Sequence, residues 1–284
     1  MTKLTPPTRG RNTNMNTLGR LKTGSLGKDQ SIYNKMFEKV VIAEFYRGSI
    51  AHNMFISDPE NEFPSDDQDV MVVYHYPIQY YWTLESYHQN KDVFEEKHED
   101  IDVVGYEIKK MFHLLSGLNP NTTPSLYTRE QDFTQLSPTW KYVMENRDVF
   151  IKKSLIRDVY FGYAQDQYRR MVDKKSWFGY MGAKRKNLYE KIGYDAKYAA
   201  HAIRLMRMGQ EFLRDGMPQV FRENDRDELL EIKEGKWSLE KIQSLYSMEM
   251  LNLEKEFRKS KLPEKDTKHS VNKLLYEVME MIFN

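Results

Sequence analysis

The chain has 284 residues, 40% of them hydrophobic, and its 43 Lys and Arg almost balance its 42 Asp and Glu. This length is enough to bury a substantial core, in one large domain or two small ones. A formal net charge of +1 argues against a protein that coats nucleic acid over its whole surface, although it allows a local basic groove. The absence of cysteine excludes disulfides and thiolate zinc sites, as is typical of proteins in a reducing cytoplasm.

The N-terminal segment, residues 1–30, is rich in Thr, Asn, Gly, Lys and Arg and has almost no large apolar side chains. It lacks the apolar block of a signal peptide, and no run in the chain reaches the roughly eighteen apolar residues of a membrane span. We therefore expect a cytoplasmic protein with no membrane partner. The segment itself is expected to be a flexible basic tail, either solvated or touching a nucleic-acid backbone.

Residues 31–135 combine strand and helix patterns. Three runs rich in β-branched and aromatic residues predict buried strands; they are Val40–Tyr46, Val70–Tyr76 and Asp100–Tyr106. A long polar connection separates the first two, and loops of this length inside a compact domain are often functional. Glu107–Leu115 then has apolar residues at helical spacing, and Gly117 is expected to end that helix.

Residues 136–284 have a mainly helical pattern. The expected helices are 137–146, 150–172, 182–191, 197–215, 238–259 and 267–282. The layout predicts an α+β fold, with a small mixed-sheet core in residues 31–135 followed by a helical domain in residues 136–284. We expect the active site in the cleft between these two parts, because pockets tend to form at such junctions.

Three acidic residues precede or open the second and third predicted strands: Asp67, Asp69 and Asp102. Alternation along a strand places Asp67 and Asp69 on one face. Neighbouring carboxylates without a counter-charge repel, and a bound cation relieves that repulsion. Oxygen ligands of this kind suit Mg²⁺. With Asp102 from the neighbouring strand, the three carboxylates predict a two-metal site, in which Asp102 also accepts the proton of an attacking hydroxyl.

The dipeptide Gly48-Ser49 lies about twenty residues before these carboxylates, directly after the first predicted strand. Gly48 permits close approach of the backbone, and Ser49 offers a hydroxyl and an amide, so both suit a triphosphate. Taken singly, each of these features is common in solvated loops. Their order, from strand to Gly-Ser to Asp-x-Asp to Asp on a further strand, favours a metal-dependent phosphate site.

Gly48–Asn53 (GSIAHN) and Asp66–Asp69 (DDQD) resemble the signature of polymerase-β-like nucleotidyltransferases. The chain is more narrowly similar to the RlaP-type predicted nucleotidyltransferases, which are associated with RNA repair. Further matching segments are 102–110, 118–120, 193–205, 228–233 and 261–263. Asn53 stands where the family usually has Gly, but Asn tolerates a left-handed backbone. Ala196 stands where Thr is common.

The most specific matching string, residues 194–205, places Lys197, His201 and Arg204 four and three residues apart, on one helix face. Such a row of basic side chains suits phosphate oxygens. The alternative is a face packed against acids of the first part, with His201 as a core histidine. The resemblance favours nucleotide binding by this row, together with Gly48 and Ser49.

The resemblance implies a magnesium- or manganese-dependent nucleotidyltransferase that moves NMP from an NTP to an acceptor hydroxyl and releases pyrophosphate. Its metals are expected at Asp67, Asp69 and Asp102. The acceptor can be an RNA end, a tRNA, a protein or a small molecule. One rival function is a catalytically inactive nucleotide- or RNA-binding module, against which the three intact carboxylates argue.

Overall fold

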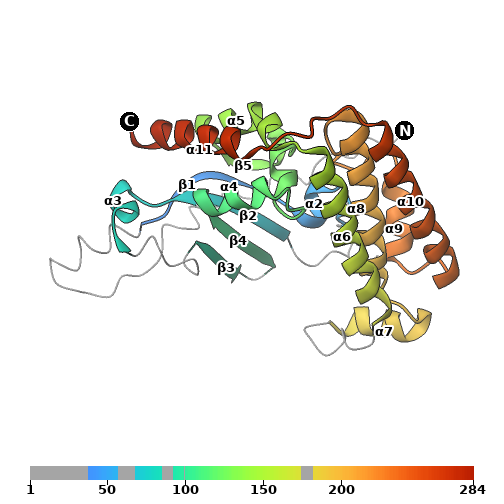
Figure 1. Cartoon of the computed structure of the whole chain (residues 1–284). Coiled ribbons are helices and arrows are strands. Elements are labelled where there is room, and N and C mark those ends of the chain that lie inside the picture. The colour runs from blue at the N-terminus through green and yellow to red at the C-terminus, as the bar shows by residue number, and fades with distance from the viewer. Residues whose placement is uncertain (1–37, 57–67, 85–91, 99, 174–181) are drawn as a thin grey trace.

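A computed structural model describes residues 38–56, 68–84, 92–98, 100–173 and 182–284. A mixed β-sheet lies at one end, and a bundle of long helices lies beside it (Figure 1). The expected α+β class is therefore confirmed. No helix in these ranges has both the length and the apolar character needed to cross a membrane.

Within the described ranges the sheet has five strands in the order β3-β4-β2-β1-β5. Their bounds are Val40–Tyr46 for β1, Gln68–His75 for β2, Val93–His98 for β3, Ile101–Glu107 for β4 and Phe133–Leu136 for β5. β2 and β4 are parallel and the other neighbours are antiparallel. The three predicted strands are thus confirmed as β1, β2 and β4, whereas the polar edge strands β3 and β5 were not predicted.

β2 is buried on both faces, which explains its continuous apolar sequence. Met71 and Val73 belong to the main core on the helix-covered face, whereas Val70 and Val72 pack in a second, smaller cluster on the other face. Asp69 and Met71 are two residues apart in β2, so their side chains lie on the same face of the sheet. Alternation along the strand therefore points Asp69 to the side of the sheet that faces the helices.

The helices agree closely with the expected ones. The long ones are α4 (Ile108–Ser116), α5 (Pro138–Glu145), α6 (Lys153–Val172), α7 (Ala183–Ile192), α8 (Ala196–Asp215), α9 (Arg226–Lys233), α10 (Leu239–Lys259) and α11 (Lys268–Phe283), with short helices α2 (Gly48–Ala51) and α3 (Ile78–Tyr81). Ser137 and Ser238 accept hydrogen bonds from the backbone of Trp140 and Lys241, as N-caps do. α9 is a helix that the sequence pattern did not predict.

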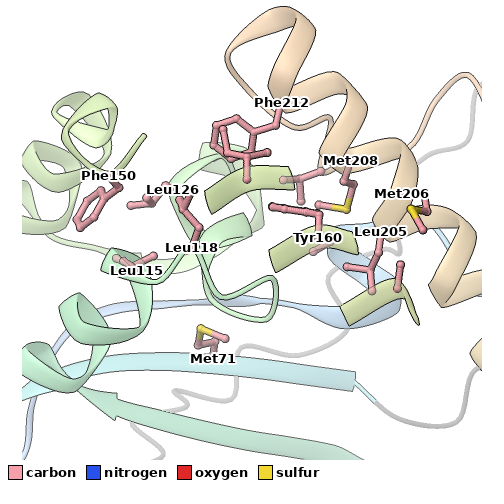
Figure 2. Packing of buried hydrophobic residues seen from close by; sticks show 14 of the residues in the cluster. Met71, Leu115, Leu118, Leu126, Phe150, Tyr160, Leu205, Met206, Met208 and Phe212 are labelled. Atoms are coloured by element: carbon pink, nitrogen blue, oxygen red, sulfur yellow. The ribbon is translucent and has the colours of Figure 1, made fainter. Parts of the chain in front are cut away.

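α8 is the central helix of the bundle and packs against α6, α9 and α10 (Figure 1). The same hydrophobic core continues into the sheet: Figure 2 shows Met71 of β2 near Leu115 and Leu118, with Tyr160 and Met208 of the bundle beyond them. This shared core fixes the bundle against the sheet. The division into residues 1–30, 31–135 and 136–284 remains a prediction, and the first of these parts lies outside the described residues.

Candidate active site

Two of the three predicted acidic residues lie side by side on adjacent parallel strands. In the register of β2 and β4, Asp69 is the direct partner of Asp102. Both side chains lie on the helix-covered face, because Asp69 shares the parity of Met71, and Asp102 that of Val104. Asp67 lies outside the described residues, so its expected place beside Asp69 remains a prediction.

Each of these carboxylates has a basic neighbour that the sequence analysis missed. Lys97 Nζ lies 3.3 Å from Asp102 Oδ1, and Arg47 Nη2 lies 3.6 Å from Asp69 Oδ1. The acidic side chains are 38% and 31% exposed, and such solvated ion pairs stabilise a protein by at most about 1 kcal/mol. A divalent cation can therefore displace these neighbours at little cost.

Gly48 begins the short helix α2, which lies where the sheet meets the bundle (Figure 1). Its φ of 61° is in the left-handed region, and a Cβ at this position would lie 2.1 Å from Asp69 Oδ2. Its neighbour Arg47 donates its backbone N–H to the Asp69 carbonyl oxygen over 2.8 Å. Only glycine both adopts this conformation easily and leaves room for the Asp69 carboxylate.

The residues that follow α2 dock onto the bundle. His52 Nδ1 donates to the Val220 carbonyl oxygen and Asn53 Nδ2 donates to that of Arg222, each over 2.8 Å. Arg226 Nε returns a hydrogen bond to the Asn53 carbonyl oxygen over 2.7 Å. Asn53 has a φ of 58°, so it adopts the left-handed conformation that the sequence argument allowed it. These contacts hold the Gly48 turn against the segment between α8 and α9 and against the start of α9.

Lys197, His201 and Arg204 lie along α8, as predicted, and no carboxylate pairs with them within the described part of the chain. Lys197 is exposed. The buried Nε of Arg204 has no hydrogen-bond partner. His201 Nδ1 is 3.1 Å from Gln167 Oε1. The alternative that this face packs against acids of the first part of the chain therefore has no ion pair to support it.

Burial and the positive charges of this region lower the pKa values of the two histidines in it. Burial and then the charges of Arg204 and Lys197 lower the pKa of His201 to about 3, so this imidazole is neutral at physiological pH. Burial, followed by Arg204, also lowers the pKa of His52 well below its usual value. His52 thus connects the α8 cations to the Gly48 turn, which itself contacts Asp69. The α8 cations therefore act on a residue next to the turn that contacts Asp69, and cations and carboxylates are the groups that a metal-bound polyphosphate requires.

Lys233 is a further basic residue of this region that the sequence analysis did not single out. Burial, then the charges of Lys197 and Arg204, lower its pKa to about 8. The sequence contains one indication of its importance, because Lys233 is the last residue of 228–233, one of the segments that carry the family resemblance. It was missed because the short helix α9 was not predicted.

Comparisons with known proteins identify a family to which the chain is similar. The model of the RNA repair pathway DNA polymerase beta family, RlaP, matches residues 61–277, well over half of the chain. A nucleotidyltransferase-like protein from Exiguobacterium sibiricum 255-15, known from its crystal structure, is 13% identical, with a TM-score of 0.28; the match covers 89% of this chain and 78% of that one. Among curated proteins, no sequence matches.

Proposed function

The chain belongs to the RNA repair pathway DNA polymerase beta family, and on this premise we propose that it transfers NMP from an NTP to an acceptor hydroxyl. The observation that carries the proposal is the pairing of Asp69 with Asp102 on one face of the sheet, with the Gly48 turn against Asp69. An RNA end is the first acceptor to test, because the family is described by an RNA repair pathway.

The donor set fits a hard divalent cation. Asp69 and Asp102 offer carboxylate oxygens from adjacent strands, partly exposed and each beside a basic side chain in a solvated ion pair. Within the described residues no group of three or more possible ligands gathers, so the site needs a further donor, and we assign that role to Asp67. Mg²⁺ or Mn²⁺ bound here would activate the attacking hydroxyl and stabilise the charge of the leaving pyrophosphate.

The remaining steps belong to side chains of this protein. Lys197 and Arg204 bind the triphosphate oxygens and offset their charge. Asp102 accepts the proton of the acceptor hydroxyl as the new phosphodiester bond forms. His201 is neutral, and its hydrogen bond to Gln167 fixes the orientation of the imidazole ring. It therefore helps to position the neighbouring α8 side chains and adds no positive charge. Gly48 and Ser49 would bring their backbone N–H groups close to the phosphates, and glycine at position 48 also leaves room for the Asp69 carboxylate beside them.

The proposal is tested with Asp69→Asn and Asp102→Asn. Each labelled NTP is incubated with Mg²⁺ or Mn²⁺ and with RNA, tRNA, protein or small-molecule acceptors. Transfer by the wild-type protein should be abolished in both variants, while their thermal melts stay close to that of the wild type, since each change removes clustered negative charge.

A matched control is Glu96→Gln. Glu96 lies opposite Val103, whose side chain packs on the other face of the sheet, so the variant removes a carboxylate away from the site. It should transfer normally. Undiminished transfer by a folded Asp69→Asn or Asp102→Asn protein would reject the catalytic assignment.

A further inference from the structure

Helix α9 contacts the segment after the Gly48 turn through two basic side chains. Arg226 Nε donates to the Asn53 carbonyl oxygen over 2.7 Å, and Lys233 Nζ donates to the Met54 carbonyl oxygen over 3.3 Å. The two residues are seven apart, so they lie on the same face of the helix. Both therefore hold adjacent peptide groups, next to the turn that contacts Asp69.

These two side chains differ in their electrostatic surroundings. Arg226 has a carboxylate partner, Asp227, at 3.2 Å. Lys233 has none within the described part of the chain. Its neighbour Glu234 is already bound to Lys236 at 2.6 Å. Lys233 instead shares its surroundings with Lys197 and Arg204, whose charges act on it.

The ammonium group of Lys233 thus has unused binding capacity. It carries three N–H donors, and the Met54 carbonyl oxygen accepts one of them. Like charges held close together in a partly buried site are unfavourable unless an anion joins them. Lys197, Arg204 and Lys233 come from two helices, α8 and α9, and are all without an ion pair in the described residues. An anion between the two helices would satisfy the three groups together.

We propose that Lys233 binds phosphate oxygens of the nucleotide together with Lys197 and Arg204, so that α9 forms one wall of the phosphate site. This inference rests on the proposed function and extends it to a residue outside the α8 row. The ligand class is a polyphosphate, as in an NTP or the pyrophosphate product.

Binding of a polyphosphate through Lys233 is coupled to the uptake of a proton. In the free protein its pKa is lowered to about 8, by burial and then by Lys197 and Arg204, while Glu234 opposes the shift. A bound polyphosphate brings negative charge and raises that pKa, so near pH 8 the protein takes up part of a proton as it binds. His52 and His201 contribute nothing at this pH, because their pKa values lie below the usual histidine value. Arg204, whose pKa burial and then Arg222 lower to about 9, contributes a smaller share than Lys233.

Calorimetry with inorganic tripolyphosphate tests this, in EDTA at pH 8 and in two buffers of different ionisation enthalpy. The wild-type protein should bind with proton uptake. Lys233→Met should bind roughly ten- to a hundredfold more weakly, as expected for one lost charge-assisted contact. It should also lose the Lys233 share of the uptake. Lys233→Arg should retain binding and lose most of this uptake, since the pKa of a guanidinium group lies above that of an ammonium group in the same surroundings.

Arg226→Met is the matched control, because it removes the corresponding contact to Asn53 without removing a cation of the site. If Lys233 only holds the Met54 carbonyl oxygen, Lys233→Met and Arg226→Met should have similar effects on tripolyphosphate binding, and the proposal is wrong. Equal affinity and proton uptake in wild-type and Lys233→Met protein also overturn it, while nucleotidyl transfer stands on its own assay. Failure of the wild-type protein to bind tripolyphosphate overturns the phosphate site as well.

Discussion

Two arginines three residues apart on α8 have opposite surroundings. Arg207 donates to three carboxylates, those of Glu249, Asp225 and Glu228, at 2.8, 3.0 and 2.9 Å. Arg204 makes no ion pair within the described residues, and its Nε is buried without a partner. The same residue type on the same helix is therefore fully satisfied in one region and left unsatisfied in the other.

The satisfied region is a network built around the segment that receives His52 and Asn53. Arg222, only 2% exposed, binds Glu211 at 2.8 Å and Asp225 at 2.6 Å. Burial alone raises the pKa of Asp225, but hydrogen bonds from Arg222 and Arg207 more than offset this and hold it below its usual value. These pairs fix the carbonyl groups of Val220 and Arg222 that accept hydrogen bonds from the turn after α2.

The contrast between Arg207 and Arg204 distinguishes charged side chains that hold the fold together from charged side chains that are available to bind a ligand. Buried charges are costly unless they are paired, so a fold that leaves cations unpaired retains them for another reason. In this protein the unpaired Lys233 and the paired Arg222 both contact the segment that follows the Gly48 turn. We infer that the network positions the site and that the unpaired group binds the ligand.

The largest expected effect is the loss of stability in Arg207→Ala. This change leaves the carboxylate of Glu249, which is 6% exposed, without its strongest partner. Breaking a buried pair in this way costs about 3–5 kcal/mol. Urea unfolding of Arg207→Ala and Arg204→Ala measures the contrast. Equal losses in the two variants would remove the distinction between the regions.

A smaller effect, on ligand binding, is expected for Lys197→Ala and Arg204→Ala. Each should weaken NTP use by roughly ten- to a hundredfold, because a charge-assisted contact to phosphate is lost. The melting temperature without nucleotide should hardly change, since neither side chain has an ion pair in the described residues to lose. Kinetics and thermal melts with and without NTP measure both properties.

Arg214→Ala is the control on the same helix, because Arg214 pairs with the exposed Asp215 at 2.7 Å, outside the cation group. Its NTP kinetics should be those of the wild type. A large loss of stability in Arg204→Ala, with ordinary NTP affinity in the folded protein, would instead assign Arg204 a structural role.

The effect that is smallest at neutral pH is a pH dependence from His201. Its pKa of about 3 in the folded protein lies below the value of about 6.5 expected in the unfolded chain. The unfolded state therefore takes up a proton first, and stability falls as pH falls from about 6.5 toward 3, by at most about 1.4 kcal/mol per pH unit. His201→Gln should show a shallower fall in melting temperature over this range.

Tripolyphosphate should also make that fall shallower in the wild-type protein, because an anion favours the protonated imidazole. The control His269→Gln removes an exposed histidine of α11 and should leave the slope unchanged. A wild-type slope in His201→Gln would contradict the assignment of a buried, neutral imidazole beside the cations.

Local sequence patterns predicted most of the elements, and the misses have physical reasons. The helices α4 to α8, α10 and α11 have apolar positions at helical spacing, caps, or both, and these signals do not depend on distant residues. β3 and β5 were missed because Val93–His98 and Phe133–Leu136 are polar or short edge strands that bury little surface. α9 has eight residues and no side-chain hydrogen bond at its N-cap, whereas α5, of the same length, begins with the Ser137 cap and a proline.

The candidate site shows the same division. The position of Asp69 and Asp102 on one face of the sheet could be predicted from the sequence, because it depends only on alternation along each strand and on the two strands being neighbours. The row of Lys197, His201 and Arg204 was readable from helical spacing together with the family resemblance. The neighbours Arg47 and Lys97 were not, because nothing in the local pattern shows which cation approaches which carboxylate.

The sequence by itself determined the α+β class, the principal strands and helices, and the residues at which phosphate chemistry was to be expected. Only the tertiary structure decided which charges are paired. Arg204 and Arg207 look alike in the sequence, and the partner that distinguishes them, Glu249, is 42 residues further along the chain. Pairing depends on which side chains the packed helices bring together, and a helical period cannot specify contacts between segments so far apart.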